Sequence, residues 1–204
     1  MQFNLFSPRV RTVGSRFIGF GLAAMVAVSL SHWHHSIPYV EHILWLIGWM
    51  LVGLGVMGRI WCSIYISGFK NAKLVMLGPY SLCRNPLYLF SFFGGMGIMM
   101  LTETFLYPLI FAVIYLAYYR YVIGQEERFL SVKYGEVYQQ YFKTVPRFWP
   151  NFSNYHEPES YLVSPKHIRL FLGQVVWFIW VAALVQLFEE LRMMDMIPTL
   201  LHLA

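Results

Sequence analysis

Long apolar stretches separated by short polar breaks recur along the whole chain. They cover about residues 17–30, 43–66, 86–100, 105–123 and 168–188. A backbone in lipid must satisfy its own hydrogen bonds, so an apolar stretch of about 20 residues is expected to cross the membrane as a helix. The sequence therefore predicts an all-α, polytopic membrane helix bundle with about five transmembrane helices.

The composition agrees with one membrane domain that spans residues 1–204. Of the 204 residues, 58% are hydrophobic and only 12% are charged, whereas soluble domains contain about 25% charged residues. The chain is too short for two membrane domains of ordinary size. Its two cysteines, Cys62 and Cys83, form neither a disulfide framework nor a metal-ligand spacing.

The first apolar stretch follows a basic segment that carries Arg9, Arg11 and Arg16. This order is also typical of a signal peptide, but a clean small-residue cleavage site is hard to find. We predict a retained helix. A histidine cluster follows, for which we predict an interfacial loop and no metal site, because no carboxylate or cysteine completes a ligand set; its members are His32, His34 and His35.

The placement of positive charge predicts the topology. Arg192 follows the last predicted span, and the other fourteen Lys and Arg residues all fall on the side of the N-terminus. The positive-inside rule then puts the N-terminus in the cytosol and the C-terminus outside, in a bacterial inner membrane or an endomembrane. The same asymmetry explains the net charge of +5, so we expect no nucleic-acid partner.

A polar break at Gly78–Tyr88 separates two of the apolar stretches. Gly78-Pro79 is typical of a turn. Asn85 is then expected to be the N-cap of the next helix and Pro86 its first residue. Free backbone N–H groups, Arg84 and Tyr88 would form a receptor for an anionic or strongly polar ligand. The alternative is a capped membrane helix with interfacial anchors, and the local pattern leaves both open.

A second polar group, Glu126-Glu127, comes after the fourth stretch. The short connection Thr102–Thr104 predicts an antiparallel helix pair, which brings the carboxylates to the same surface as Arg84. A ligand with both a cation and a carboxylate would suit this pairing; the alternative is that both glutamates simply face water. The tyrosines that follow recur on one helical face, which predicts an amphipathic interfacial helix: Tyr134, Tyr138 and Tyr141.

The second apolar stretch is rich in glycine and carries one arginine. Small residues allow helices to pack closely in lipid, and the alternative is that Gly53-Leu54-Gly55 opens space for a cofactor. Arg59 lies at membrane depth or at its edge. An ionisable residue there is a candidate for function.

Taken in order, these motifs resemble the isoprenylcysteine carboxyl methyltransferase family, whose superfamily includes the membrane phospholipid N-methyltransferases. The resemblance covers about residues 45–150. It rests on Gly78-Pro79-Tyr80, Arg84-Asn85-Pro86-Leu87-Tyr88, Glu126-Glu127, Tyr134-Gly135-x2-Tyr138-x2-Tyr141 and Val145-Pro146-Arg147-Phe148-x-Pro150.

The resemblance implies an all-helical membrane enzyme with S-adenosyl-L-methionine bound on the cytosolic side. Its methyl acceptor would be a lipid or a small molecule with a carboxylate, amine or thiol. The carboxyl methyltransferase branch usually has His where Asn85 stands, which leaves carboxyl methylation in doubt. The implied catalytic residues are Arg84, Glu127 and Arg147, and the implied cofactor-binding residues are Gly53, Gly55, Tyr80, Arg84, Asn85, Pro86, Tyr88, Glu126, Glu127, Tyr138 and Arg147.

Methyl transfer from a sulfonium is a direct displacement, so alignment is expected to matter more than acid–base chemistry. Glu126 or Glu127 would meet the ammonium or ribose hydroxyls of the cofactor, and Arg84 or Arg147 its carboxylate. Two other functions fit the pattern. One is an NADPH-dependent membrane reductase of the sterol or steroid class, and the other is a non-catalytic membrane partner that keeps the fold.

Overall fold

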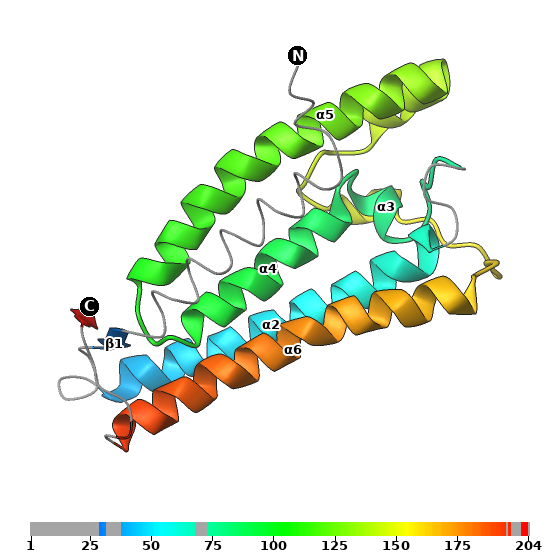
Figure 1. Ribbon diagram of the computed structural model, residues 1–204. Helices are drawn as coiled ribbons and strands as arrows, with labels where there is room; N and C mark the ends of the chain where they lie inside the picture. The colour runs from blue at the N-terminus through cyan, green and yellow to red at the C-terminus, as the bar shows by residue number, and fades with distance from the viewer. Residues whose placement is uncertain (1–28, 32–37, 68–72, 195, 197–200, 204) are drawn as a thin grey trace, which may run out of the picture.

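The computed structural model describes residues 29–31, 38–67, 73–194, 196 and 201–203. The predicted helical bundle is confirmed (Figure 1). A parallel pair of three-residue strands is the other regular structure within the described ranges. In chain order the elements are β1 (Ser29–Ser31), α2 (Pro38–Ile66), α3 (Pro79–Leu82), α4 (Pro86–Met100), α5 (Leu106–Thr144), the 3-10 turn η2 (Phe152–Asn154), α6 (Pro165–Met193) and β2 (Leu201–Leu203).

The long helices run side by side. α2 packs most extensively on α4, α6 lies along α2, and α5 lies along α4 (Figure 1). Three described helices, α2, α5 and α6, are long and apolar enough to cross a membrane, and α4 is a shorter apolar helix of 15 residues. The predicted first span and the histidine cluster fall outside the described residues.

Backbone contact between α2 and α4 explains the glycines in both helices. A Cβ atom placed on Gly55 would lie 2.5 Å from the Gly94 Cα, and one on Gly97 would lie 2.5 Å from the Gly48 carbonyl oxygen. Only hydrogen side chains permit such a close approach. Gly53 has no other atom within 4 Å of such a Cβ, so its side of α2 is open.

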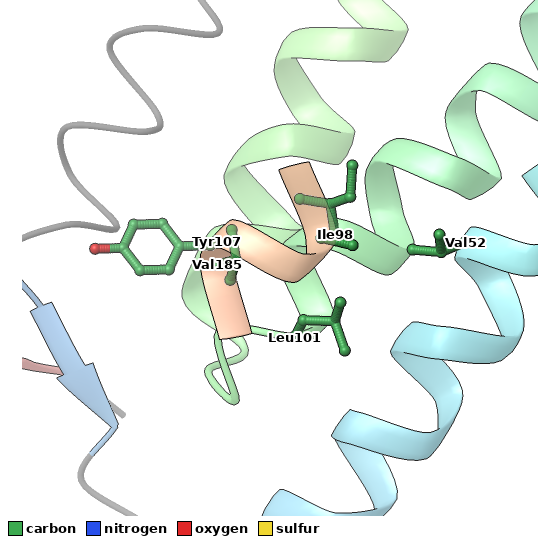
Figure 2. Packing of buried hydrophobic residues seen from close by; sticks show 6 residues of the cluster. Val52, Ile98, Leu101, Tyr107 and Val185 are labelled. Carbon is green, nitrogen blue, oxygen red and sulfur yellow. The ribbon is translucent and has the colours of Figure 1, made fainter. Parts of the chain in front are cut away.

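One end of the bundle is filled by an apolar cluster to which four helices contribute. Figure 2 shows Val52 of α2, Ile98 of α4, Tyr107 of α5 and Val185 of α6 around Leu101, which caps α4. Tyr107 and Leu101 are almost completely buried. This cluster fixes the helices at the end of the bundle opposite α3, and we call the two ends the α3 end and the opposite end.

Helix α5 is longer than the apolar stretch that predicts it. The sequence pattern ends the span near residue 123, but the helix continues through the polar segment that follows, because good helix formers such as Gln125, Glu126 and Glu127 occupy it. It breaks at Gly135, whose φ of 53° and ψ of −127° are not helical. A short final segment then runs to Thr144, so α5 extends past the start of α4 (Figure 1).

Candidate functional site

Three segments that are distant in sequence meet at the α3 end. The Tyr141 hydroxyl donates to the Tyr80 carbonyl oxygen at 2.7 Å, which ties the last turn of α5 to α3. The Arg84 backbone N–H donates to the Pro146 carbonyl oxygen at 2.8 Å, and the Asn151 N–H donates to that of Leu82 at 3.0 Å. These bonds hold the start of α4, the polar part of α5 and the chain after α5 against one another.

Glu127 lies at the centre of this junction. Its Oε1 is 3.2 Å from Arg84 Nε, and its Oε2 is 2.9 Å from Arg147 Nη2. The Asn85 side-chain amide also donates to Glu127 Oε1, at 3.3 Å. Only 12% of the Glu127 side chain is exposed. One carboxylate therefore joins two cations, and the group keeps a net positive charge.

The two arginines have different surroundings. Arg84 Nη1 donates to the carbonyl oxygens of Phe142 at 2.8 Å and Val145 at 2.6 Å, and its guanidinium lies 4.0 Å from the Phe142 ring centroid. Arg84 is thus fully engaged and 8% exposed, whereas 35% of the Arg147 side chain is exposed. Arg147 Nε is buried and has no hydrogen-bond partner, so this donor is unused.

The neighbouring carboxylate has a separate partner. Glu126 Oε2 accepts a hydrogen bond from the Tyr88 hydroxyl at 2.7 Å, and the Tyr88 carbonyl oxygen accepts one from the Tyr115 hydroxyl at 2.8 Å. The Tyr80 hydroxyl nearby is buried without a partner. Burial raises the pKa of Tyr80 well above its ordinary value, so this phenol stays protonated and can donate.

Most of the residues singled out from the sequence come together here. Arg84, Asn85, Glu127 and Arg147 are directly bonded to one another. Pro86 begins α4 beside them. Tyr88 bonds Glu126, and Tyr80 and Tyr138 are both buried around Tyr141 at the same end of the bundle.

The glycine pair and Asn85 differ from their expected arrangement. Gly55 lies at the crossing of α2 and α4 against Gly94, nine residues along α4 from Asn85, and the space beside Gly53 is open. Asn85 occupies the predicted N-cap position but makes no capping hydrogen bond. Its amide nitrogen donates to Glu127 Oε1 and to the Arg147 carbonyl oxygen, so tertiary partners hold the side chain whose oxygen would otherwise accept from a helix N–H.

Sequence reasoning misses the carbonyl oxygens of Phe142 and Val145 as partners of Arg84. A backbone acceptor carries no residue signature. The available signal is Pro146, since a proline that ends a helix leaves the last carbonyl groups without intrahelical partners. A nearby arginine can then satisfy them.

Known proteins are similar to this chain over most of its length. Residues 40–137 match the family model for phospholipid methyltransferases. A nickel-cobalt-cadmium resistance protein, NccN, of Alcaligenes xylosoxydans xylosoxydans is 32% identical over 175 residues, which are 86% of this chain and 82% of that protein. The chain belongs to the isoprenylcysteine and phospholipid methyltransferase-like family of membrane proteins.

Two other relatives of this methyltransferase-like chain extend the comparison. A cobalt-zinc-cadmium resistance protein, CzcN, of Cupriavidus metallidurans is 34% identical over 74% of this chain and 69% of that protein. A protein-S-isoprenylcysteine O-methyltransferase of Schizosaccharomyces pombe is 34% identical over 77 residues, which are 38% of this chain and 33% of the enzyme. No solved structure matches the chain.

Proposed function

We propose that the protein is a membrane methyltransferase that uses S-adenosyl-L-methionine and acts on a lipophilic or small acceptor at the cytosolic face. One observation carries this proposal: Glu127 is held between Arg84 and Arg147, and Arg147 Nε is buried without a partner. Unsatisfied buried donors are costly unless a ligand meets them. An amino-acid ligand carries the carboxylate that would do so.

The residues fit the amino-acid part of this cofactor, which when bound supplies an activated methyl group. Arg147 Nε is the better candidate for its carboxylate, because Arg84 already binds Glu127 and two carbonyl oxygens. Glu126 accepts from Tyr88 through Oε2, and its other carboxylate oxygen, Oε1, would meet the ammonium group. Glu127 and Arg84 act as positioning residues that hold Arg147 in place.

The charge asymmetry of the chain supports the proposed cytosolic location. The α3 end holds Arg84, Arg128 and Arg147, whereas Arg192 lies at the end of α6 at the opposite end. The positive-inside rule favours the cytosol for the end that is richer in Arg and Lys. We therefore propose that the N-terminus is cytosolic, that the C-terminus is outside, and that membrane lipids surround the helices between them.

The test is binding of S-adenosylhomocysteine to purified protein, measured by calorimetry in a neutral detergent. We expect Glu127→Gln to weaken binding at least about tenfold, because Arg147 loses the carboxylate that orients it. Glu136→Gln is the matched control, since Glu136 is exposed on the same helix and should leave binding unchanged. Equally tight binding by both variants would remove Glu127 from the cofactor site.

The acceptor is then identified with labelled S-adenosyl-L-methionine. The purified protein is incubated with a membrane lipid extract or with small thiols, and the labelled product is isolated. The proposal is supported if wild type forms a labelled product and Glu127→Gln does not. The matches do not favour the NADPH-dependent reductase considered from the sequence. That function would regain support if no labelled product formed and if NADPH stabilised the protein.

A second candidate function is a contribution to resistance against divalent metals, which the coverage of the two resistance proteins favours. Within the described residues, no group of three or more His, Cys, Asp or Glu side chains could hold a metal ion. We therefore propose that such a contribution would act through the cluster of Glu127, Arg84 and Arg147. Growth of a metal-sensitive host on nickel, cobalt or cadmium tests this, with wild type protecting and Glu127→Gln failing to protect.

A further inference from the structure

Arg59 is a charged residue inside the bundle that the Glu127 site does not use. It lies on α2, seven residues before the helix ends at Ile66. Arg59 Nη1 donates to the Ser91 hydroxyl on α4, and its guanidinium lies 5.6 Å from the Phe171 ring centroid and 5.2 Å from that of Phe178, both on α6. Among the described residues, no carboxylate pairs with it. A cation without a counter-ion at this depth is costly and indicates a function.

Unused hydrogen-bond donors lie around this cation. Arg59 Nε is buried and has no partner, and the same is true of the Tyr80 hydroxyl. Tyr80 is only 7% exposed and packs in one cluster with Cys62, which follows Arg59 by three residues on α2. The Ser91 hydroxyl donates to the Leu87 carbonyl oxygen at 2.6 Å, which orients it to accept from Arg59. A guanidinium whose Nε is buried and unsatisfied, and a buried phenol that can donate, together form a receptor for an anion.

The position of Arg59 relates this receptor to the Glu127 site. Ser91, its partner, follows Tyr88 by three residues on α4, which is about 4.5 Å along the helix axis. Tyr88 in turn binds Glu126. Arg59 therefore lies about one turn deeper in the bundle than the carboxylate proposed to meet the cofactor. Phe171 and Phe178 on α6 provide an apolar wall on its other side.

We propose that Arg59, with the Tyr80 hydroxyl, binds the anionic oxygen group of an amphiphilic methyl acceptor, either a carboxylate or a phosphate. The inference rests on the proposed function, because it assigns the acceptor side of the same site. The apolar part of the acceptor lies against α6 and the surrounding lipid. Ser91 is a positioning residue that holds the guanidinium, and the anion replaces the missing counter-ion.

The experiment measures binding of amphiphiles to the full chain purified in a neutral detergent. Dodecanoate and dodecyl phosphate are the anionic probes, dodecanol is the uncharged probe, and inorganic phosphate and acetate are the free anions. We expect wild type to bind both anionic amphiphiles at least tenfold more tightly than dodecanol or the free anions. Free anions that bind as tightly as the amphiphiles would overturn the assignment to an amphiphilic acceptor.

The variants test Arg59 itself. Arg59→Gln should weaken binding of the anionic amphiphiles at least tenfold, Arg59→Lys should retain most of it, and Tyr80→Phe should weaken it less than Arg59→Gln does. Arg120→Gln is the matched control, because Arg120 is exposed on α5. Wild-type affinity in Arg59→Gln overturns the inference. If Arg59→Gln does not fold, Arg59→Lys provides the test. The inference is overturned if Arg59→Lys binds the anionic amphiphiles no more tightly than wild type binds dodecanol.

Binding of S-adenosylhomocysteine to the same preparations separates the two proposals. We expect Arg59→Gln to bind it as wild type does, since among the described residues Arg59 contacts Ser91, Phe171 and Phe178 and not the Glu127 site. Arg59-dependent binding of anionic amphiphiles without any binding of S-adenosylhomocysteine would support the anion site and contradict the proposed function. Binding of S-adenosylhomocysteine without Arg59-dependent binding of the amphiphiles would contradict the anion site alone.

Discussion

The two ends of the bundle each contain a buried carboxylate paired with arginine, but the pairs are built differently. At the opposite end, Glu189 and Arg192 lie three residues apart on α6, with Oε1 and Nη2 3.2 Å apart and side chains 7% and 0% exposed. At the α3 end, Glu127 joins Arg84, 43 residues away, to Arg147. A helix forms the first pair by itself. The second pair requires three segments to assemble.

This difference suggests what each pair is for. A pair within one helix brings its two charges together without the assembly of other segments. The Glu127 pair fixes the relative positions of α4, α5 and the chain after α5, and it leaves Arg147 Nε unsatisfied. The Arg147 side chain is 35% exposed, whereas the side chains of the Glu189 pair are 7% and 0% exposed, so the α3 end has the character of a binding site.

The largest expected effect separates the two carboxylates by activity. Glu127→Gln should lower the rate of methyl transfer about 100-fold, a typical result of removing one preorganised electrostatic group. Glu189→Gln should change the rate less than about threefold, because its partner lies on the same helix at the opposite end. The measurement is transfer of label from S-adenosyl-L-methionine to extracted lipids. Comparable losses in both variants would contradict the functional difference between the ends.

The next effect distinguishes the two arginines of the α3 end. The Arg84 side chain is 8% exposed and donates to Glu127 and to two carbonyl oxygens, and Arg84→Ala removes all of these bonds. We expect a loss of about 3 kcal/mol in unfolding free energy, or roughly 6–12 °C in thermal midpoint. Arg147→Ala should cost only about 1 kcal/mol, because its side chain is 35% exposed.

The measurement is thermal unfolding in detergent, followed by circular dichroism, with S-adenosylhomocysteine binding recorded alongside. Arg147→Ala should lose more ligand affinity than stability, and Arg84→Ala should lose substantial stability. The reverse order of stability losses would show that Arg147, rather than Arg84, holds the segments together.

The helix crossing that lies between the two ends provides the third test. Gly55→Ala places a Cβ 2.5 Å from the Gly94 Cα, so α2 and α4 must move apart at a cost of about 1–3 kcal/mol. Gly53→Ala is the matched control, because a Cβ there meets nothing within 4 Å. We expect a lower thermal midpoint for the first variant and an unchanged or slightly higher one for the second. Equal midpoints would mean that the close approach of α2 and α4 at Gly55 does not contribute to stability.

Some of this architecture is predictable from the sequence because local signals determine it. The bounds of α4 follow from Pro86 and from the short Thr102–Thr104 connection. That connection makes α4 and α5 antiparallel neighbours, which brings Arg84 and Glu127 to one end. The helical bundle itself follows from the apolar stretches.

Other features depend on tertiary partners that leave no periodic pattern. The end of α5 lies well beyond its apolar stretch, since polar helix formers continue a helix as well as apolar ones do. Asn85 stands at the N-cap but bonds Glu127, and Arg84 is held by backbone carbonyl oxygens. No residue type predicts these hydrogen bonds, because each of them joins groups that lie far apart along the chain.

The smallest effect tests one hydrogen bond of the α3 end. Tyr141→Phe removes the hydroxyl that donates to the Tyr80 carbonyl oxygen at 2.7 Å and leaves that buried acceptor unsatisfied. The expected loss is about 1 kcal/mol, or roughly 2–4 °C in thermal midpoint. Tyr138→Phe is the matched control, since Tyr138 is equally buried in the same cluster. If the two variants melt together, the bond to α3 contributes nothing, and the ionic pairs of Glu127 alone must hold the three segments.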